Sequence, residues 1–233
     1  MTAQKKIGWL LIAGAIGVFI PYIILTITFE YPEILRQDTG IVLTKFHEGK
    51  SPLIFTWWAF AILGLPLLIA YIKIGQLFEN RVSFIKWVTT LGVISGIVQI
   101  IGLLRWVFVV PVIANNFVTA SDPIEKEIAK YSFQTIHQFG GVLLGEHLGQ
   151  LFTIIWTIML SIAFIKLKLF PSWVSWLGII SSIIYFFAQA DLFLTVIPGF
   201  PVLAMTGFIG STLWLIWLVI IGIMFIKSKN INR

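Results

Sequence analysis

The sequence predicts an all-α integral membrane protein, a bundle of six transmembrane helices with short amphipathic helices in an outer loop. Charged residues make up 11% of the 233-residue chain and hydrophobic residues 58%, whereas about a quarter of a soluble domain is charged. Six apolar stretches reach the ~20 residues that a helix needs to cross a bilayer. They cover residues 7–29, 53–72, 84–110, 135–165, 173–194 and 202–226, within a single predicted transmembrane domain spanning residues 1–233.

Lysine and arginine are divided unequally between the two sides of these spans. Ten lie on the side that holds both termini, five lie in the opposite loops, and Arg105 lies inside the third span. Because cytoplasmic loops carry the excess of positive charge, we expect both termini to be cytoplasmic. This topology accounts for the pI of about 9.6, so we expect membrane lipids as partners and no nucleic acid. The chain has no cysteine, which excludes disulfides and thiolate ligands.

The two longer outer loops contain helix signals. Between residues 30 and 52, apolar residues recur near helical spacing, and Gly40 and Gly49 are the expected helix ends. Asp122 precedes Pro123, and Glu125 follows three residues after Asp122, a pattern that starts helices. We expect the second helix to continue without a break into the fourth span.

Tryptophans lie near the predicted ends of the spans. Indole rings gather at the level of the lipid headgroups, so we expect these residues to form the aromatic belts of a membrane protein. They are Trp9, Trp57, Trp58, Trp87, Trp106, Trp173 and Trp176.

The fourth span contains polar residues that are costly in a lipid environment. They are His137, Glu146, His147 and Gln150. At about 100° per residue, Glu146 and Gln150 share one quadrant of an α-helix, whereas His137 projects opposite Glu146. Glycines 141, 145 and 149 form a separate ladder, which predicts close packing against another helix.

Polar residues of the third and fifth spans lie at compatible depths, so we predict an outward-facing polar chamber. The predicted lining residues are Gln99, Arg105, His137, Glu146, His147, Gln150, Tyr185, Gln189 and Asp191. An ionised Glu146 needs a partner in this setting, and Arg105 is the expected counter-charge. The chamber, covered by the outer amphipathic segment, would bind a small molecule or lipid.

Three alternatives remain open at this point. A membrane-embedded metal-dependent enzyme would use His137, Glu146, His147 and Asp191, because imidazole and carboxylate bind zinc or iron. A proton-linked small-molecule transporter would explain ionisable groups at mid-depth, although no broken helix pair or inverted repeat supports it. A structural polar network would need no ligand. The sequence has no nucleophile elbow, P-loop or dinucleotide motif, so it identifies neither a cofactor nor a catalytic residue.

Several segments occur together in an order that indicates a family. They are YPEILR at Tyr31–Arg36, IVLTKF at Ile41–Phe46, LRWVFVVP at Leu104–Pro111, HQFGG and LGE between His137 and Glu146, and FPSWVSWLG at Phe170–Gly178. The chain thereby resembles a family of uncharacterised bacterial multi-spanning membrane proteins, classified as a domain of unknown function. The resemblance implies a bacterial inner-membrane location and implies no activity.

Overall fold

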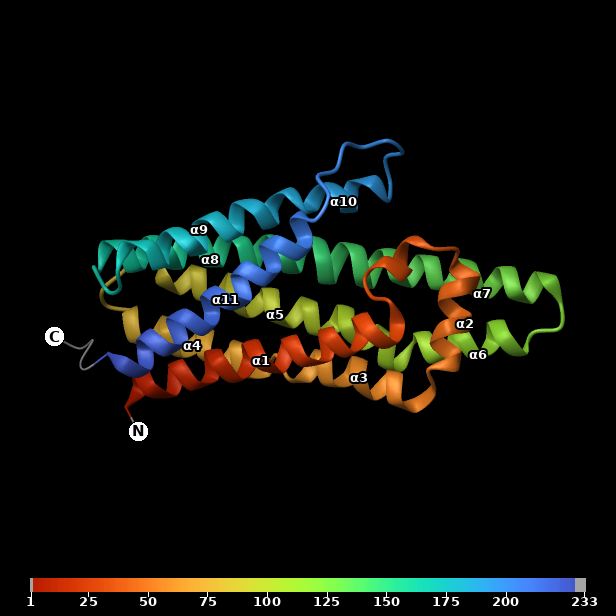
Figure 1. The fold of residues 1–233 in the computed structure, drawn as a ribbon, viewed down its shortest axis with the longest axis horizontal. Helices are drawn as coiled ribbons and strands as arrows, with labels where there is room; N and C mark the ends of the chain where they lie inside the picture. Colours follow the sequence, from red (N-terminus) through yellow and green to blue (C-terminus); the bar gives the residue numbers. More distant parts are fainter. Residues whose placement is uncertain (1, 229–233) are drawn as a thin grey trace. The chain divides into compact units, whose positions relative to one another are not determined.

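The structure is a computed structural model that describes residues 2–228, and every regular element in that range is a helix (Figure 1). Within this range, six helical segments are long and apolar enough to cross a membrane. They are Ala3–Phe29, Lys50–Phe78, Ile85–Thr119, Pro123–Lys166, Ser172–Leu194 and Thr206–Lys227. The predicted all-α fold with six membrane-spanning helices is therefore confirmed.

The first and last segments are single helices, and the other four contain more than one helical element. The first segment is α1 (Ala3–Phe29), and the last is α11 (Thr206–Lys227). The others consist of α3 (Lys50–Ile62) with α4 (Leu65–Phe78), α5 (Ile85–Phe108) with α6 (Val110–Thr119), α7 (Pro123–Ile136) with η2 (His137–Leu148) and α8 (Gly149–Lys166), and α9 (Ser172–Phe187) with α10 (Gln189–Leu194). Proline near the start of α4 and α6 explains two of these breaks, because it lacks the N–H that would continue the preceding helix.

The chain divides into two compact units. Unit 1 consists of Met1–Ile16, Gly64–Ile97 and His147–Arg233, and unit 2 consists of Gly17–Leu63 and Val98–Glu146. The boundaries fall inside α1, α5 and η2, so each of these three helices contributes residues to both units. Unit 2 contains both of the longer loops that the sequence places on the outer side.

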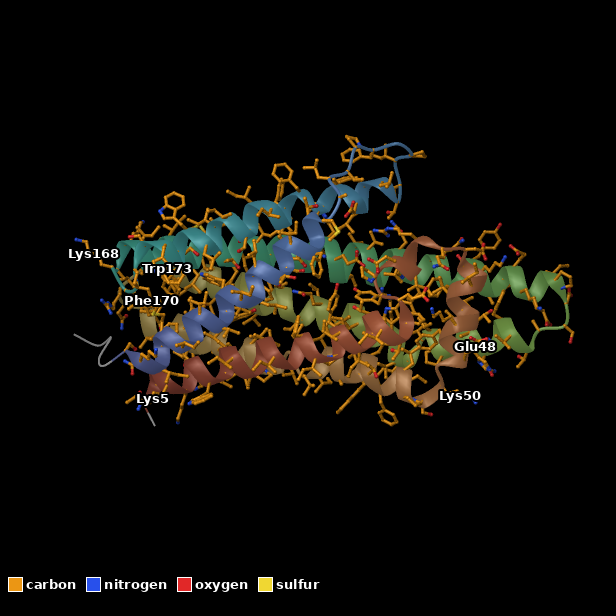
Figure 2. The ribbon with its side chains drawn as sticks, in the orientation of Figure 1. Lys5, Glu48, Lys50, Lys168, Phe170 and Trp173 are labelled. Atoms are coloured by element: carbon orange, nitrogen blue, oxygen red, sulfur yellow. The ribbon has the colours of Figure 1, made fainter. Side chains whose placement is uncertain are left out.

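In unit 1, α9 packs against both α8 and α11, and the start of α1 lies beside the end of α11. A Cβ atom added to Gly222 would lie 2.8 Å from Cγ1 of Ile12, and one added to Gly8 would lie 2.6 Å from Cγ1 of Ile226. Lys5 and Lys168 lie at the same end of this unit (Figure 2). The start of α1 and the end of α11 therefore lie at the same end of unit 1, as an even number of membrane crossings requires.

In unit 2, an aromatic core lies beneath the segment between the first two spans. This segment forms η1 (Glu33–Arg36) and α2 (Thr39–Glu48), and α2 packs across α6 and α7 (Figure 1). Ile34, Val42, Leu43 and Phe46 are buried in the same cluster as the rings of Trp57 and Trp106. The predicted short helices are thus present, and α2 is part of a core.

Helix ends agree with the sequence in most places. The Asp122 side chain accepts a hydrogen bond from the Ile124 N–H at 2.9 Å, and helical structure continues from Pro123 to Lys166. Gly40 was expected to end a helix, but it lies in the first turn of α2, where its N–H donates to Asp38 at 2.8 Å. Asp38 acts as the N-cap, and this capping contact explains the difference.

The prediction of an aromatic belt is wrong for two of the seven tryptophans. Trp57 and Trp106 are fully buried in unit 2, with 0% of each side chain exposed. Their rings stack on each other with centroids 4.7 Å apart. The other five tryptophans are exposed, as the belt interpretation requires.

Candidate functional site

Residues His137–Leu148 form a π-helix, η2, inside the long fourth segment. Its hydrogen bonds reach five residues along the chain, so each residue turns by roughly 80° instead of ~100°. Nine residues then make about two full turns, which brings His137 and Glu146 to the same side of the helix. The prediction that these side chains project in opposite directions is wrong, because it assumed α-helical geometry.

Arg105 of α5 contacts the side chain of His137. Its guanidinium is buried, with 7% of the side chain exposed. Arg105 Nη2 lies 3.3 Å from Nδ1 of His137. Because a guanidinium can only donate, Nδ1 must be the acceptor, and His137 is therefore neutral with its proton on Nε2.

Two further groups act on the same guanidinium. Arg105 Nη1 donates to the carbonyl oxygen of Gly102, one turn earlier in α5. The charge of Glu146 also acts on Arg105 electrostatically, and their ion pairing stays a prediction. Arg105, His137 and Glu146 therefore form one polar cluster, hereafter the Arg105 cluster, and all three belong to unit 2.

Aromatic side chains surround the Arg105 cluster. The Arg105 Cζ atom lies 5.2 Å from the centre of the Trp106 ring, within the range of a cation–π interaction. On its other side, the Trp106 ring stacks on Trp57. His137 stacks on Phe133 with ring centroids 5.3 Å apart. The polar side chains of the Arg105 cluster are thus surrounded largely by aromatic rings, which offer them few hydrogen-bond partners.

Three N–H groups in this region have no hydrogen-bond acceptor among residues 2–228. They are Arg105 Nε, Trp57 Nε1 and Trp106 Nε1, and all three are buried. Buried donors are nearly always paired in native proteins, and leaving one unpaired costs about 1–3 kcal/mol. The Arg105 cluster is therefore rich in donors and short of acceptors.

Glycines make room for the Arg105 side chain and for the contact between α5 and η2. A Cβ atom at Gly141 would lie 2.7 Å from Arg105 Cζ, and one at Gly102 would lie 2.8 Å from the Gly145 Cα. Gly145 therefore supports close helix packing, as the predicted ladder requires. Gly141 instead leaves space for a guanidinium, because the π-helix turns it toward Arg105.

The remaining polar residues form a separate hydrogen-bonded chain in unit 1. His147 Nδ1 lies 2.8 Å from Gln189 Oε1, and Gln189 Nε2 donates to Gln150 Oε1 at 2.8 Å. An amide oxygen can only accept, so in this arrangement Nδ1 of His147 carries a proton and donates it. A neutral His147 then has its lone pair on Nε2. Gln189 is almost fully buried, with 5% of its side chain exposed.

The nine predicted chamber residues thus belong to two units. Gln99, Arg105, His137 and Glu146 lie in unit 2, and His147, Gln150, Tyr185, Gln189 and Asp191 lie in unit 1. In unit 1, the backbone of Tyr185 packs closely against Gly210 of α11, and Asp191 lies in the first turn of α10. The contacts described above join predicted residues into two groups. These are the Arg105 cluster in unit 2 and the His147 chain in unit 1.

An open depression on the surface of unit 2 has a volume of about 610 Å³. It is lined by Gln134, Thr135, Gln138, Phe139 and Leu143. None of the nine predicted chamber residues lines it. The chamber therefore remains a prediction, and the depression is a shallow surface feature on one side of the α7–η2 helix.

The four residues considered as metal ligands do not form a metal site. Within residues 2–228, no three His, Asp or Glu side chains lie close enough together to hold a metal ion. His137 also directs its Nδ1 lone pair to a cationic guanidinium, so this atom is not available to a metal. The geometry therefore gives no support to the metal-dependent enzyme.

Residues 7–222 match the model of a protein family described as Domain of unknown function (DUF4386). The chain belongs to this family. The match covers the Arg105 cluster, the His147 chain and all the segments on which the resemblance rested. A search of curated proteins and a search of solved structures each found no match. This DUF4386 protein is thus a multi-pass membrane protein whose family description names no activity.

Sequence reasoning missed Trp57 and Trp106 as site residues, because a tryptophan near the end of a span is typical of the lipid interface. The signal that could have identified Trp106 is its position directly after Arg105. A buried arginine needs neighbours that stabilise its charge, and an indole ring is one of them. The sequence holds no comparable signal for Trp57, which reaches the site through tertiary packing.

Proposed function

We propose that this DUF4386 protein binds a small molecule or lipid at the Arg105 cluster, from the outer side of a bacterial inner membrane. The observation that carries the proposal is the set of three buried N–H groups without acceptors, on Trp57, Arg105 and Trp106. A bound ligand with hydrogen-bond acceptor atoms would pair these three N–H groups.

The cost of this arrangement supports a role in binding. An arginine inside a membrane-spanning helix is costly, by up to about 2.5–3.5 kcal/mol at the helix centre on insertion scales, and Arg105 lies in the last turn of α5. His137 and the Gly102 carbonyl satisfy part of the guanidinium, and Nε remains unpaired. A purely structural network would be expected to pair all of its members, since a partly satisfied network is worse than an apolar core.

The segment over the core gives the site a cover. Phe46 of α2 lies 5.4 Å from Trp106, measured between ring centroids, and α2 also contacts α6 and α7. Lys45 of α2 forms an ion pair with Glu30 at 2.5 Å, and Gln134 of α7 donates to Thr39 at 3.1 Å. These polar contacts add to the buried side chains of Val42, Leu43 and Phe46 in holding α2 over the site. We propose that α2 moves away from α6 and α7 to admit the ligand.

Native mass spectrometry of the purified protein tests the binding proposal. The wild-type protein should carry a bound molecule after mild detergent extraction. The double variant Trp57→Phe/Trp106→Phe should carry at least tenfold less of it, since two of the donors are removed. Trp217→Phe is the matched control, because the Trp217 indole already donates to the Val174 carbonyl at 2.9 Å. Equal occupancy in all three proteins would contradict the proposal.

A second candidate function is proton-linked transport, and the His147 chain in unit 1 is the observation that favours it. Nδ1 of His147 donates to Gln189, and Gln189 donates in turn to Gln150. Histidine serves as a proton shuttle in many proteins, so a histidine within a hydrogen-bonded chain suits a proton relay.

Proton flux into proteoliposomes tests this second candidate. An imposed pH gradient should decay faster with the wild-type protein than with His147→Asn, which keeps an amide donor but cannot titrate. Glu146→Gln should also slow the decay if Glu146 lies on the route. Equal decay rates in all three preparations would remove the support for transport.

A further inference from the structure

We infer that the ligand of the Arg105 cluster carries an oxyanion head group, a carboxylate or a phosphate. The inference rests on the proposed binding function and names the chemistry that the unpaired groups of Trp57, Arg105 and Trp106 would recognise. It follows from the kind of atom left unpaired, from the geometry of the guanidinium, and from the rings around it.

The unpaired polar atoms of unit 2 are all donors. Trp57 Nε1, Arg105 Nε and Trp106 Nε1 each carry a hydrogen and have no acceptor among the described residues. Indole and guanidinium groups have no acceptor atom of their own. A head group that donates, such as an ammonium, would leave all three donors unpaired. The guest must therefore supply several acceptor oxygens.

The guanidinium has a free edge of the right shape. Nη1 donates to Gly102 and Nη2 donates to His137, which fixes the plane of the group. The edge that carries Nε–H is left for a ligand. A planar guanidinium edge matches the paired oxygens of a carboxylate or phosphate, and such charge-assisted bonds are about twice as strong as neutral ones.

The three donors belong to neighbouring side chains, with Trp106 in contact with both Trp57 and Arg105. The Trp106 ring lies 4.7 Å from the Trp57 ring and 5.2 Å from Arg105 Cζ. A compact head group with two or three oxygens is the smallest ligand group that can accept hydrogen bonds from several neighbouring N–H groups. The rings of Phe29 and Phe46, 5.5 and 5.4 Å from Trp106, provide apolar surface for a hydrocarbon tail attached to it.

Glu146 gives the inference an independent test. Its charge acts on Arg105, so an anionic ligand would compete with this carboxylate for the same cation. Glu146→Gln removes the competing charge and keeps the shape of the side chain. It should therefore strengthen the binding of an oxyanion and leave the binding of a neutral molecule unchanged.

The experiment measures helix melting by circular dichroism in lipid-free, neutral maltoside detergent. The probes are oleate, methyl oleate and inorganic phosphate, with sodium chloride at matched ionic strength. A ligand that binds only the folded state raises the Tm as its concentration exceeds its Kd. We expect oleate to raise the Tm of the wild-type protein by several degrees and methyl oleate to have no such effect. The rise should be larger in Glu146→Gln and at least halved in Trp57→Phe/Trp106→Phe.

The arms of the experiment separate the sources of the oxyanion. A Tm rise with oleate alone identifies an amphiphile such as a lipid acid, and a rise with phosphate alone identifies a free anion. Trp217→Phe should respond as the wild-type protein does. If methyl oleate raises the Tm as much as oleate does, the inference of an oxyanion head group is wrong, but the binding function stands. A co-purified molecule without an acidic group would lead to the same conclusion. Absence of any Tm rise together with absence of a co-purified molecule would refute both proposals.

Discussion

His137 and Arg105 illustrate how a single contact fixes a protonation state. Because Arg105 can only donate, the 3.3 Å contact to Nδ1 requires a neutral imidazole. A protonated His137 would place two donors and two positive charges against each other. The contact therefore defines His137 as a group that orients Arg105, with Gly102 holding the other side of the guanidinium.

The tryptophans offer a prediction about paired and unpaired indoles. Trp106→Phe removes an N–H that has no acceptor among the described residues, whereas Trp217→Phe removes a hydrogen bond to the Val174 carbonyl. Both side chains are fully buried, so the loss of volume is matched. Without ligand, Trp217→Phe should destabilise the protein by about 0.5–1.5 kcal/mol more than Trp106→Phe, which is the net contribution of one hydrogen bond. Equal losses in denaturant titrations would show that the Trp106 N–H is paired in solution.

Two adjacent glycines provide a second prediction about Arg105. A Cβ atom at Gly141 would overlap the guanidinium, lying 2.7 Å from Cζ, whereas one at Gly140 would lie 3.4 Å from Cδ. Gly141→Ala should cost about 1–3 kcal/mol through overpacking and should displace Arg105 from His137. Gly140→Ala should be neutral or slightly stabilising, because alanine favours helix. Thermal unfolding of the two variants side by side measures the difference, and a similar loss in both would contradict the predicted position of the guanidinium.

At the scale of elements, the π-helix determines which side chains meet. Twelve residues of η2 follow this geometry, although π-helices usually occur as single-turn insertions, frequently at functional sites. The change in rotation per residue turns Glu146 to the same side of the helix as His137, which contacts the Arg105 guanidinium. A helical-wheel projection with α-helical geometry places His137 and Glu146 on opposite sides. Their position on the same side therefore depends on the π-helical geometry of η2.

The close contact between α5 and η2 leads to an asymmetric prediction. A Cβ atom at Gly102 would lie 2.7 Å from the Gly140 carbonyl oxygen, but one at Gly145 would come no closer than 3.4 Å to its neighbours. Backbone atoms cannot move aside as a flexible side chain can. Gly102→Ala should therefore destabilise the protein by about 1–3 kcal/mol, and Gly145→Ala should have a much smaller effect. A larger loss for Gly145→Ala in thermal unfolding would overturn this packing.

At the scale of the whole molecule, the proposed orientation can be tested with single cysteines, because the natural chain has none. Ser121 lies in a loop before α7 and Ser172 is the first residue of α9. Both are exposed, and the predicted topology places them on opposite sides of the membrane. Ser121 is preferred to Asp122, whose side chain caps α7. In intact cells, Ser121→Cys should react with an impermeant maleimide, and Ser172→Cys should react only after the membrane is opened. The reverse pattern would place both termini outside.

The sequence alone determined the number and approximate limits of the six spans and the Asp122 cap. These features depend on apolar length and on residues close together in the chain, and such signals act locally. The pairing of Arg105 with Glu146 stays a prediction that rests on the cost of a lone charge inside a membrane. Only the tertiary structure decided that Trp57 and Trp106 are buried, that η2 is a π-helix, and that the His147 chain and the Arg105 cluster belong to different units. Those outcomes depend on residues distant in sequence, and the buried surface and hydrogen bonds that favour them exist only once the helices have packed.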